Sequence, residues 1–117
     1  MQKLNALIID DEIDICFILT NILRRNNINS KYVNRIEDAR TLLEKESPAL
    51  IFLDNRLPDG LGINFVNDIK QRLAPDAKVI MITAFDSPDD RRLASERGVD
   101  VFLSKPLETK SILAAIS

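Results

Sequence analysis

The chain has 117 residues, of which 45% are hydrophobic, and this is the size and composition of one globular domain. A net charge of −2 gives no basic surface for nucleic acid or for a membrane. Histidine is absent, which excludes histidine-based acid–base catalysis and imidazole metal sites and leaves carboxylate, hydroxyl and amine chemistry.

Short apolar segments of strand length alternate with stretches in which apolar residues recur at helical spacing. The predicted strands lie near residues 4–9, 31–33, 50–53, 79–82 and 101–103. The predicted helices contain Ile15–Leu23, Ile36–Leu43, Phe65–Leu73 and Ser87–Arg97, and a last helix begins at about Leu107. The helix over 87–97 has few apolar residues, so we expect it to be the most exposed.

This alternation predicts a single α/β domain over residues 1–117. The fold class is flavodoxin-like and doubly wound, (βα)5, with a five-stranded parallel sheet of order 2-1-3-4-5 and helices on both faces. Capping signals agree with it. Asn34 and Glu37 have the spacing of a capping box, Ser87 precedes a proline at a helix start, and Gly98 falls at a helix end.

Asp10 and Asp11 end the first predicted strand and allow two interpretations. Asp11 would cap the following helix, with Glu12 as its first residue, but this leaves the charge of Asp10 without an explanation. A cation would offset the repulsion between the two carboxylates. The predicted strand order places Asp54, at the end of the third strand, beside this pair. Three carboxylates with no histidine or arginine at a strand end predict an oxygen-preferring divalent cation.

Thr83 and Lys105 follow the fourth and fifth predicted strands. Either residue alone would be ordinary, since threonine is common in strands and lysine on surfaces. Pro106 restricts the residue before it to extended backbone, which sets the direction of the Lys105 side chain. An ammonium aimed into an acidic crevice can pair with a carboxylate or with a phosphoryl group attached to it.

Four short motifs therefore stand at predicted strand ends, and their order and spacing are together specific. They are Ile9-Asp10-Asp11-Glu12, Leu53-Asp54 with Leu57-Pro58 and Gly62, Ile82-Thr83-Ala84, and Leu103-Ser104-Lys105-Pro106. On these motifs the chain resembles the receiver domains of two-component response regulators, including the chemotaxis regulators. The resemblance covers essentially the whole chain.

The resemblance implies a phosphorylation site built on Asp54. This residue would be the phosphoacceptor, taking a phosphoryl group from a sensor histidine kinase or a histidine phosphotransfer protein. Mg²⁺ would be held by Asp10, Asp11, Asp54 and the main-chain carbonyl of Arg56.

The resemblance also implies a switch. Lys105, on a cis peptide bond to Pro106, would bind the phosphoryl group together with Thr83 and Ala84, and Phe102 would repack inward as Thr83 moves. The signal would leave through the surface of the fourth helix, last strand and last helix, where dimerisation is also expected. The domain would be a signalling protein and not an enzyme, apart from catalysing its own phosphorylation and dephosphorylation.

Several positions depart from the usual pattern of this family. Arg56 and Phe85 occupy positions that overlook the acyl phosphate and influence its lifetime. Asn55 stands where an aliphatic residue is usual, and Leu61 stands where a polar residue is common.

Two other functions stay open on the residues. A phosphohydrolase with an Asp54 nucleophile typically needs a second acid two residues on, where this chain has Arg56. An unphosphorylated docking module would not need the complete set of acids with Thr83 and Lys105.

Features outside these motifs indicate a cytoplasmic protein. Apolar runs of four to six residues are too short to cross a membrane. Met1–Lys3 leads directly into strand-like sequence, without the regions of a secretory signal. The chain has one cysteine, Cys16, so it cannot form an internal disulfide. Cys16 lies on the apolar side of the first predicted helix and is expected to pack there. The abrupt end at Ala114–Ser117 predicts that this domain is the N-terminal part of a longer regulator.

Overall fold

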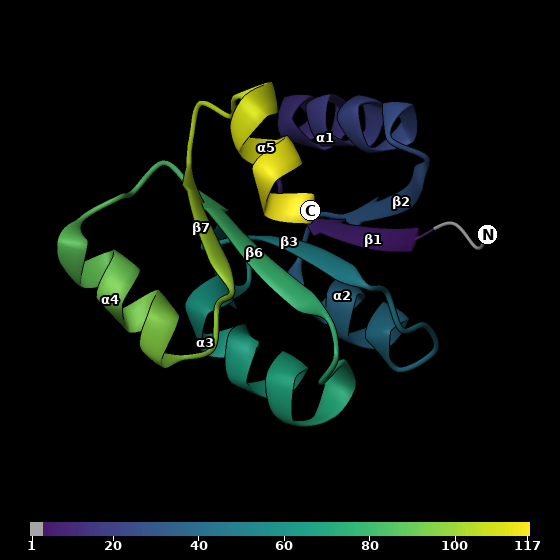
Figure 1. The fold of residues 1–117 in the computed structure, drawn as a ribbon. Coiled ribbons are helices and arrows are strands. Elements are labelled where there is room, and N and C mark those ends of the chain that lie inside the picture. Colours follow the sequence, from purple (N-terminus) through teal and green to yellow (C-terminus); the bar gives the residue numbers. More distant parts are fainter. Residues whose placement is uncertain (1–3) are drawn as a thin grey trace.

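The computed structural model describes residues 4–117 and shows a parallel sheet between two layers of helices (Figure 1). The strands of this sheet are β1 (Leu4–Ile9), β2 (Ile28–Val33), β3 (Leu50–Asp54), β6 (Lys78–Thr83) and β7 (Val101–Ser104). Their spatial order is β2-β1-β3-β6-β7, and every pairing is parallel. The strands β4 (Arg56–Leu57) and β5 (Gly60–Leu61) form a separate antiparallel hairpin. With that hairpin set aside, the predicted order 2-1-3-4-5 is confirmed.

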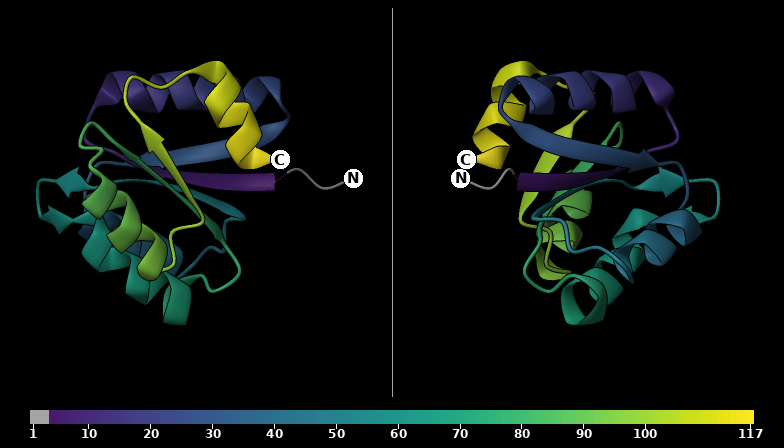
Figure 2. Two further views of the ribbon diagram at one scale, coloured as in Figure 1. Left: turned by 60° about the vertical axis from the view of Figure 1, so that its left-hand side comes forward. Right: turned by 90° about the vertical axis from the view of Figure 1, so that its right-hand side faces the viewer.

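Helices cover both faces of the sheet. They are α1 (Ile13–Arg25), α2 (Ile36–Leu43), α3 (Gly62–Asp68) with its π-helical continuation η1 (Ile69–Leu73), α4 (Pro88–Glu96) and α5 (Thr109–Ile116). One face is covered by α1 and α5, and the other by α2, α3 and α4 (Figures 1 and 2). None of the helices within residues 4–117 has the length and apolar character that crossing a bilayer requires. The prediction that Met1–Lys3 carries no secretory signal concerns residues outside the described part of the chain.

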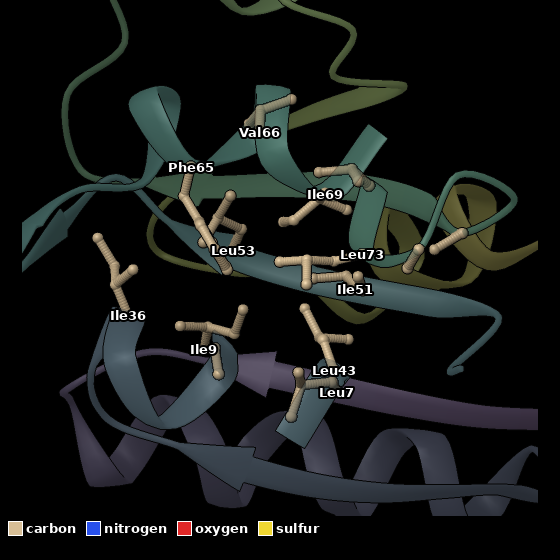
Figure 3. Packing of buried hydrophobic residues seen from close by; sticks show 14 of the residues in the cluster. Leu7, Ile9, Ile36, Leu43, Ile51, Leu53, Phe65, Val66, Ile69 and Leu73 are labelled. Carbon is tan, nitrogen blue, oxygen red and sulfur yellow. The ribbon is translucent and has the colours of Figure 1, made fainter. Parts of the chain in front are cut away.

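The core consists of two apolar clusters, one on each face of the sheet. Successive strand residues point to opposite faces, so Leu7 and Ile9 pack toward α2 and α3, while Ala6 and Ile8 pack toward α1 and α5. Figure 3 shows the first of these clusters, in which Ile51 of β3 packs with Ile69 and Leu73 of η1. Burial on both faces explains the continuously apolar segments of the inner strands β1, β3 and β6. Cys16 is buried among the α1 residues of the second cluster, as predicted.

The capping predictions for α4 are confirmed. The Ser87 hydroxyl accepts a hydrogen bond from the Asp90 main-chain N–H at 3.0 Å, and the Asp90 carboxylate accepts one from the Ser87 N–H. Gly98 follows the helix with a φ of 100°, a value that favours glycine. Ala94 is the buried residue of α4, and Leu93 is 38% exposed, so this helix is held to the core by little apolar contact.

The predicted capping box at the start of α2 is wrong. The Asn34 side chain instead donates a hydrogen bond to the main-chain carbonyl of Asp10 at 2.8 Å. The free amides of α2 are capped by Asp59 from the turn of the β4–β5 hairpin, whose two carboxylate oxygens accept from Ile36 N–H at 2.9 Å and Glu37 N–H at 3.0 Å. Local spacing favoured Asn34, but a residue distant in sequence takes that role.

Gly62, the first residue of α3, allows the helix to begin against the end of β3. A Cβ atom at this position would lie 2.2 Å from the main-chain oxygen of Asp54. The Gly62 N–H donates to the Asn55 carbonyl at 2.7 Å, and the Asn55 side-chain oxygen accepts from Ile63 N–H at 2.9 Å. Asn55, the departure noted in the sequence, therefore caps α3.

Replacing Gly62 with alanine should displace the backbone at Asp54, because the clash is with main-chain atoms that cannot rotate away. We expect Gly62→Ala to lower the free energy of unfolding by about 2 to 3 kcal/mol, measured by urea denaturation. Asn67→Ala, at an exposed position of the same helix, is the matched control and should change stability by less than about 0.5 kcal/mol. Equal stabilities for the two variants would contradict the proposed crowding.

Candidate functional site

Three polar side chains are buried where strands of the sheet end. Asp10 follows β1, Asp54 ends β3 and Thr83 ends β6, with exposed fractions of 0%, 5% and 1%. The pairing of Ile9 with Leu53 places the two aspartates at the ends of neighbouring strands. Chain connections leave the sheet in opposite directions from β1 and β3, so the aspartates lie at the topological switch point of the fold.

Lys105 follows β7 and holds these acids together. Its Nζ lies 3.0 Å from Asp10 Oδ2, 2.6 Å from Glu12 Oε1 and 3.5 Å from Asp54 Oδ2. Its main-chain N–H donates to the Thr83 carbonyl at 2.8 Å, which fixes the backbone beside β6. The Lys105–Pro106 peptide bond is cis, as expected. Lys105 is thus a strand-end cation that offsets part of the charge of the carboxylates without a metal.

A metal ion would find oxygen ligands in this pocket. One carboxylate oxygen from each of Asp10, Glu12 and Asp54 lies within 4.8 Å of the others, so these acidic residues could bind a metal. Asp10 Oδ1 accepts from the Glu12 N–H at 2.8 Å, while the buried Oδ2 accepts no directed hydrogen bond from residues 4–117, although Lys105 Nζ is close. A buried carboxylate oxygen with spare acceptor capacity fits a hard cation such as Mg²⁺ or Ca²⁺.

The structure brings together most, but not all, of the residues expected at the site. The Asp11 side chain is exposed and lies outside the group of three carboxylates, whereas Glu12 belongs to it. Sequence reasoning missed Glu12, assigning it only to the start of α1. The available signal was its place in the Ile9-Asp10-Asp11-Glu12 motif, combined with a lysine at another strand end.

Burial and like charge perturb the ionisation of the acids. Burial, followed by repulsion from Asp10, raises the pKa of Asp54 to about 6. Burial also raises the pKa of Asp10, against the hydrogen bond from the Glu12 amide and the nearby Lys105 ammonium. For Lys105, burial is outweighed by the hydrogen bond to Glu12 and the ion pair with Asp10, which raise its pKa to about 12. The ammonium therefore stays charged, and Asp54 is ionised at neutral pH without being fully stabilised as an anion.

The remaining predicted residues surround this pocket. Thr83 Oγ1 accepts a hydrogen bond from the Phe85 N–H at 3.1 Å, and Ala84 between them is exposed. The Arg56 guanidinium lies 3.8 Å from the centre of the Phe85 ring, so the two expected lifetime-tuning residues contact each other. Phe102, on β7, is half-buried and packs against the cluster on the α2–α3 face.

The arrangement matches a known family. Residues 6–117 match the family model of the response regulator receiver domain. The chain belongs to this family. Members are signalling switches of two-component systems that are activated by phosphorylation.

Named relatives agree with this assignment. The chain is 40% identical over 108 residues to the response regulator protein PilR of Pseudomonas aeruginosa, covering 92% of this chain and 24% of PilR. The matched region makes up between 24% and 48% of the full length of several response regulators that resemble this chain. This receiver domain therefore corresponds to a part of those proteins.

Solved structures also superpose closely on this fold. A response regulator from Burkholderia pseudomallei, with a phosphorylated aspartic acid, calcium ion and citrate, is 28% identical with a TM-score of 0.90, over 99% of this chain and 67% of that chain. The beryllofluoride-activated NtrC4 receiver domain dimer is 32% identical with a TM-score of 0.90, over 96% and 92% of the two chains.

Substituting Asp54 should stabilise the metal-free fold, because the folded state raises the pKa of this residue. The folded state therefore holds the Asp54 proton more tightly than the unfolded state does. The contribution of this proton to the free energy of unfolding is fully present below about pH 4 and is lost as the pH rises through about 6. We expect Asp54→Asn, in EDTA, to raise the free energy of unfolding by about 1 to 3 kcal/mol above pH 7 and by much less at about pH 4.

Urea denaturation at the two pH values measures this difference. Asp11→Asn changes the exposed carboxylate next to Asp10 in the sequence. It is the control, and its stability should differ little from that of the parent at either pH. A pH-independent gain for Asp54→Asn would show that ionisation of Asp54 is not its cause.

Proposed function

We propose that Asp54 is the phosphoacceptor of this receiver domain. The observation that carries the proposal is the placement of its carboxylate, which is 5% exposed at the switch point, with Lys105 Nζ 3.5 Å from Oδ2 and two more acids around it. An oxygen of Asp54 forms a bond to phosphorus while the phosphorus–nitrogen bond of a donor phosphohistidine breaks. The electron pair of that bond stays on the donor imidazole. A pKa of about 6 leaves Asp54 ionised for this step at neutral pH.

Lys105 supports the product of this transfer. Its ammonium is fixed among the carboxylates by the backbone contact to Thr83 and can pair with a phosphoryl oxygen on Asp54. Thr83, one strand away, has a hydroxyl that can turn from the Phe85 N–H toward the same group. The Arg56–Phe85 contact at the rim is placed to limit the approach of water and so lengthen the life of the acyl phosphate.

We infer that the cation is Mg²⁺, held by Asp10, Asp11, Asp54 and the main-chain carbonyl of Arg56. The unfilled acceptor capacity of Asp10 Oδ2 supports this set, and so does the calcium ion in the similar response regulator structure. When bound, such an ion supplies positive charge that offsets the charge of the phosphoryl oxygens. Asp11 would turn inward from its exposed position.

The partners follow from this chemistry. The donor would be a sensor histidine kinase or a histidine phosphotransfer protein, which implies a cytoplasmic location. The output would be a change in the surface formed by α4, β7 and α5, and we propose that the domain also dimerises through this surface. The similar beryllofluoride-activated NtrC4 receiver domain is a dimer. Residues 1–117 would be the receiver at the N-terminus of a longer regulator. The domain would bind neither nucleic acid nor membrane itself, and it would catalyse only its own phosphorylation and dephosphorylation.

Phosphorylation can be tested directly on the purified domain. With Mg²⁺ and acetyl phosphate, we expect intact-mass spectrometry to detect one added phosphoryl group, which EDTA or Asp54→Asn abolishes. Asp76→Asn, at an exposed acid of the turn before β6, should be modified like the parent.

The other outcomes separate the competing functions. Mg²⁺ binding without an adduct from several donors would favour a docking module. Sustained phosphate release from unrelated monoesters would favour a hydrolase, although the residue two after Asp54 is Arg56 and not an acid.

The metal ligands can be separated by two neighbouring substitutions. We expect Asp11→Asn to weaken Mg²⁺ binding on the order of tenfold or more, and Glu12→Gln to weaken it less, because the half-exposed Glu12 is drawn to the pocket by Lys105. Isothermal titration calorimetry with Mg²⁺ measures both. A larger loss for Glu12→Gln would instead assign the metal to the three carboxylates that the structure brings together.

A further inference from the structure

A cluster of polar contacts joins the β6–α4 loop, α4 and β7 on the side of the proposed output surface. Arg91, on α4, forms an ion pair with Asp86 through its Nε, and its second terminal nitrogen donates to Asp86 Oδ2 at 2.9 Å and to Ser104 Oγ at 3.2 Å. The Ser104 hydroxyl in turn donates to Asp86 Oδ2. We call these three residues the Asp86–Arg91–Ser104 cluster.

The cluster closes over Phe102. The Arg91 guanidinium lies 4.7 Å from the centre of the Phe102 ring, and the bonds to Asp86 and Ser104 fix it there. Phe102 is half-buried against the core, so its outer face is covered by a cation that two hydrogen-bonding partners, Asp86 and Ser104, orient. Figure 1 shows α4 lying beside β7.

The same cluster restrains the loop that begins at Thr83. Asp86 lies three residues after Thr83, and between them Phe85 donates its N–H to the Thr83 hydroxyl. If Thr83 turns toward a phosphoryl group, that hydrogen bond is lost and the loop must shift. Asp86 opposes such a shift because it is tied to two other elements of the fold. Hydrogen bonds from Arg91 and Ser104 hold the pKa of Asp86 at about 2, so it stays charged across the neutral range.

Other contacts of α4 are weak by comparison. Ala94 is its buried residue, and Arg92 pairs with Asp89 within the same helix at 2.8 Å, with both side chains largely exposed. An ion pair inside one helix cannot fix that helix to its neighbours. At the end of α4 the Arg97 guanidinium donates to the Asn64 side chain of α3 at 3.3 Å. Among residues 4–117, the Asp86–Arg91–Ser104 cluster is the side-chain hydrogen bonding that ties α4 to β7.

We propose that the Asp86–Arg91–Ser104 cluster is an autoinhibitory contact that holds the β6–α4 loop and Phe102 in the observed conformation. Part of the free energy gained when a phosphoryl group binds is used to break this cluster and move α4. The strength of the cluster therefore sets the fraction of molecules that switch. This inference rests on the proposed function, since it concerns the response to a group bound at Asp54.

The test measures the affinity of the domain for beryllofluoride, a phosphoryl mimic, in the presence of Mg²⁺ by ¹⁹F NMR titration. Arg91→Ala and Asp86→Asn should each raise the apparent affinity about threefold to tenfold, because the observed conformation loses contacts that the switched one does not make. Arg92→Ala, which breaks the neighbouring exposed pair, is the matched control and should leave the affinity unchanged.

A double substitution distinguishes a joint action from two separate effects. Arg91→Ala with Asp86→Asn should raise the affinity no further than either change alone, because each removes the same contact. Hydrogen exchange of the amides of residues 84–87, measured without beryllofluoride, should quicken in both single variants and not in Arg92→Ala.

The contrary outcomes are separable. An unchanged or lower affinity in Arg91→Ala, with the parent binding beryllofluoride, would overturn the autoinhibitory role alone. Additive effects of the two substitutions would overturn their joint action. A parent that binds no beryllofluoride would contradict the proposed function, and with it any control of switching by this cluster.

Discussion

The pairing of one buried ammonium with three carboxylates organises this domain. Lys105 contacts Asp10, Glu12 and Asp54 within 3.5 Å. Asp10 and Asp54 are buried, so water screens their charges poorly, whereas Glu12 is half-exposed. The pairing is incomplete, because one positive charge faces up to three negative ones. Burial first, and then repulsion from the neighbouring acids, raises the pKa of Asp10 and of Asp54. These acidic residues could bind a metal ion, and under the proposed function the added positive charge would favour the arrival of a negatively charged phosphoryl group.

The parallel fold adds a second electrostatic contribution at the same edge. After each strand the chain turns there and starts a helix, so the N-termini of the helices converge around the pocket. The side chains that satisfy their first free amides are Asp10 for the turn before α1, Asp59 for α2, Asn55 for α3 and Ser87 for α4. Helix N-termini carry partial positive charge, which favours an anion nearby. The capping residues and the proposed phosphoryl site therefore lie in the same part of the molecule.

The sequence was sufficient for the parts of the structure that depend on local pattern. Alternation of apolar segments identified the strands, although β2 begins at Ile28 and not near Lys31, because polar residues in this edge strand break the apolar run. Asp54, Thr83 and Lys105 were found because parallel strands bring their carboxyl ends together. The roles of Asp59 and Glu12 were missed because their partners, α2 and Lys105, are distant in sequence. No spacing rule along the chain reports such contacts.

The cap that Asp59 provides for α2 affects the order in which the chain can fold. The helix spans Ile36–Leu43, and its first amides are satisfied by a residue that is synthesised later. A growing chain therefore presents the two amides at the start of α2 without this partner until the β4–β5 turn has emerged and β3 has docked against β1. Complete capping of α2 therefore needs a residue from beyond β3, and it joins the first half of the domain to the segment that follows Asp54.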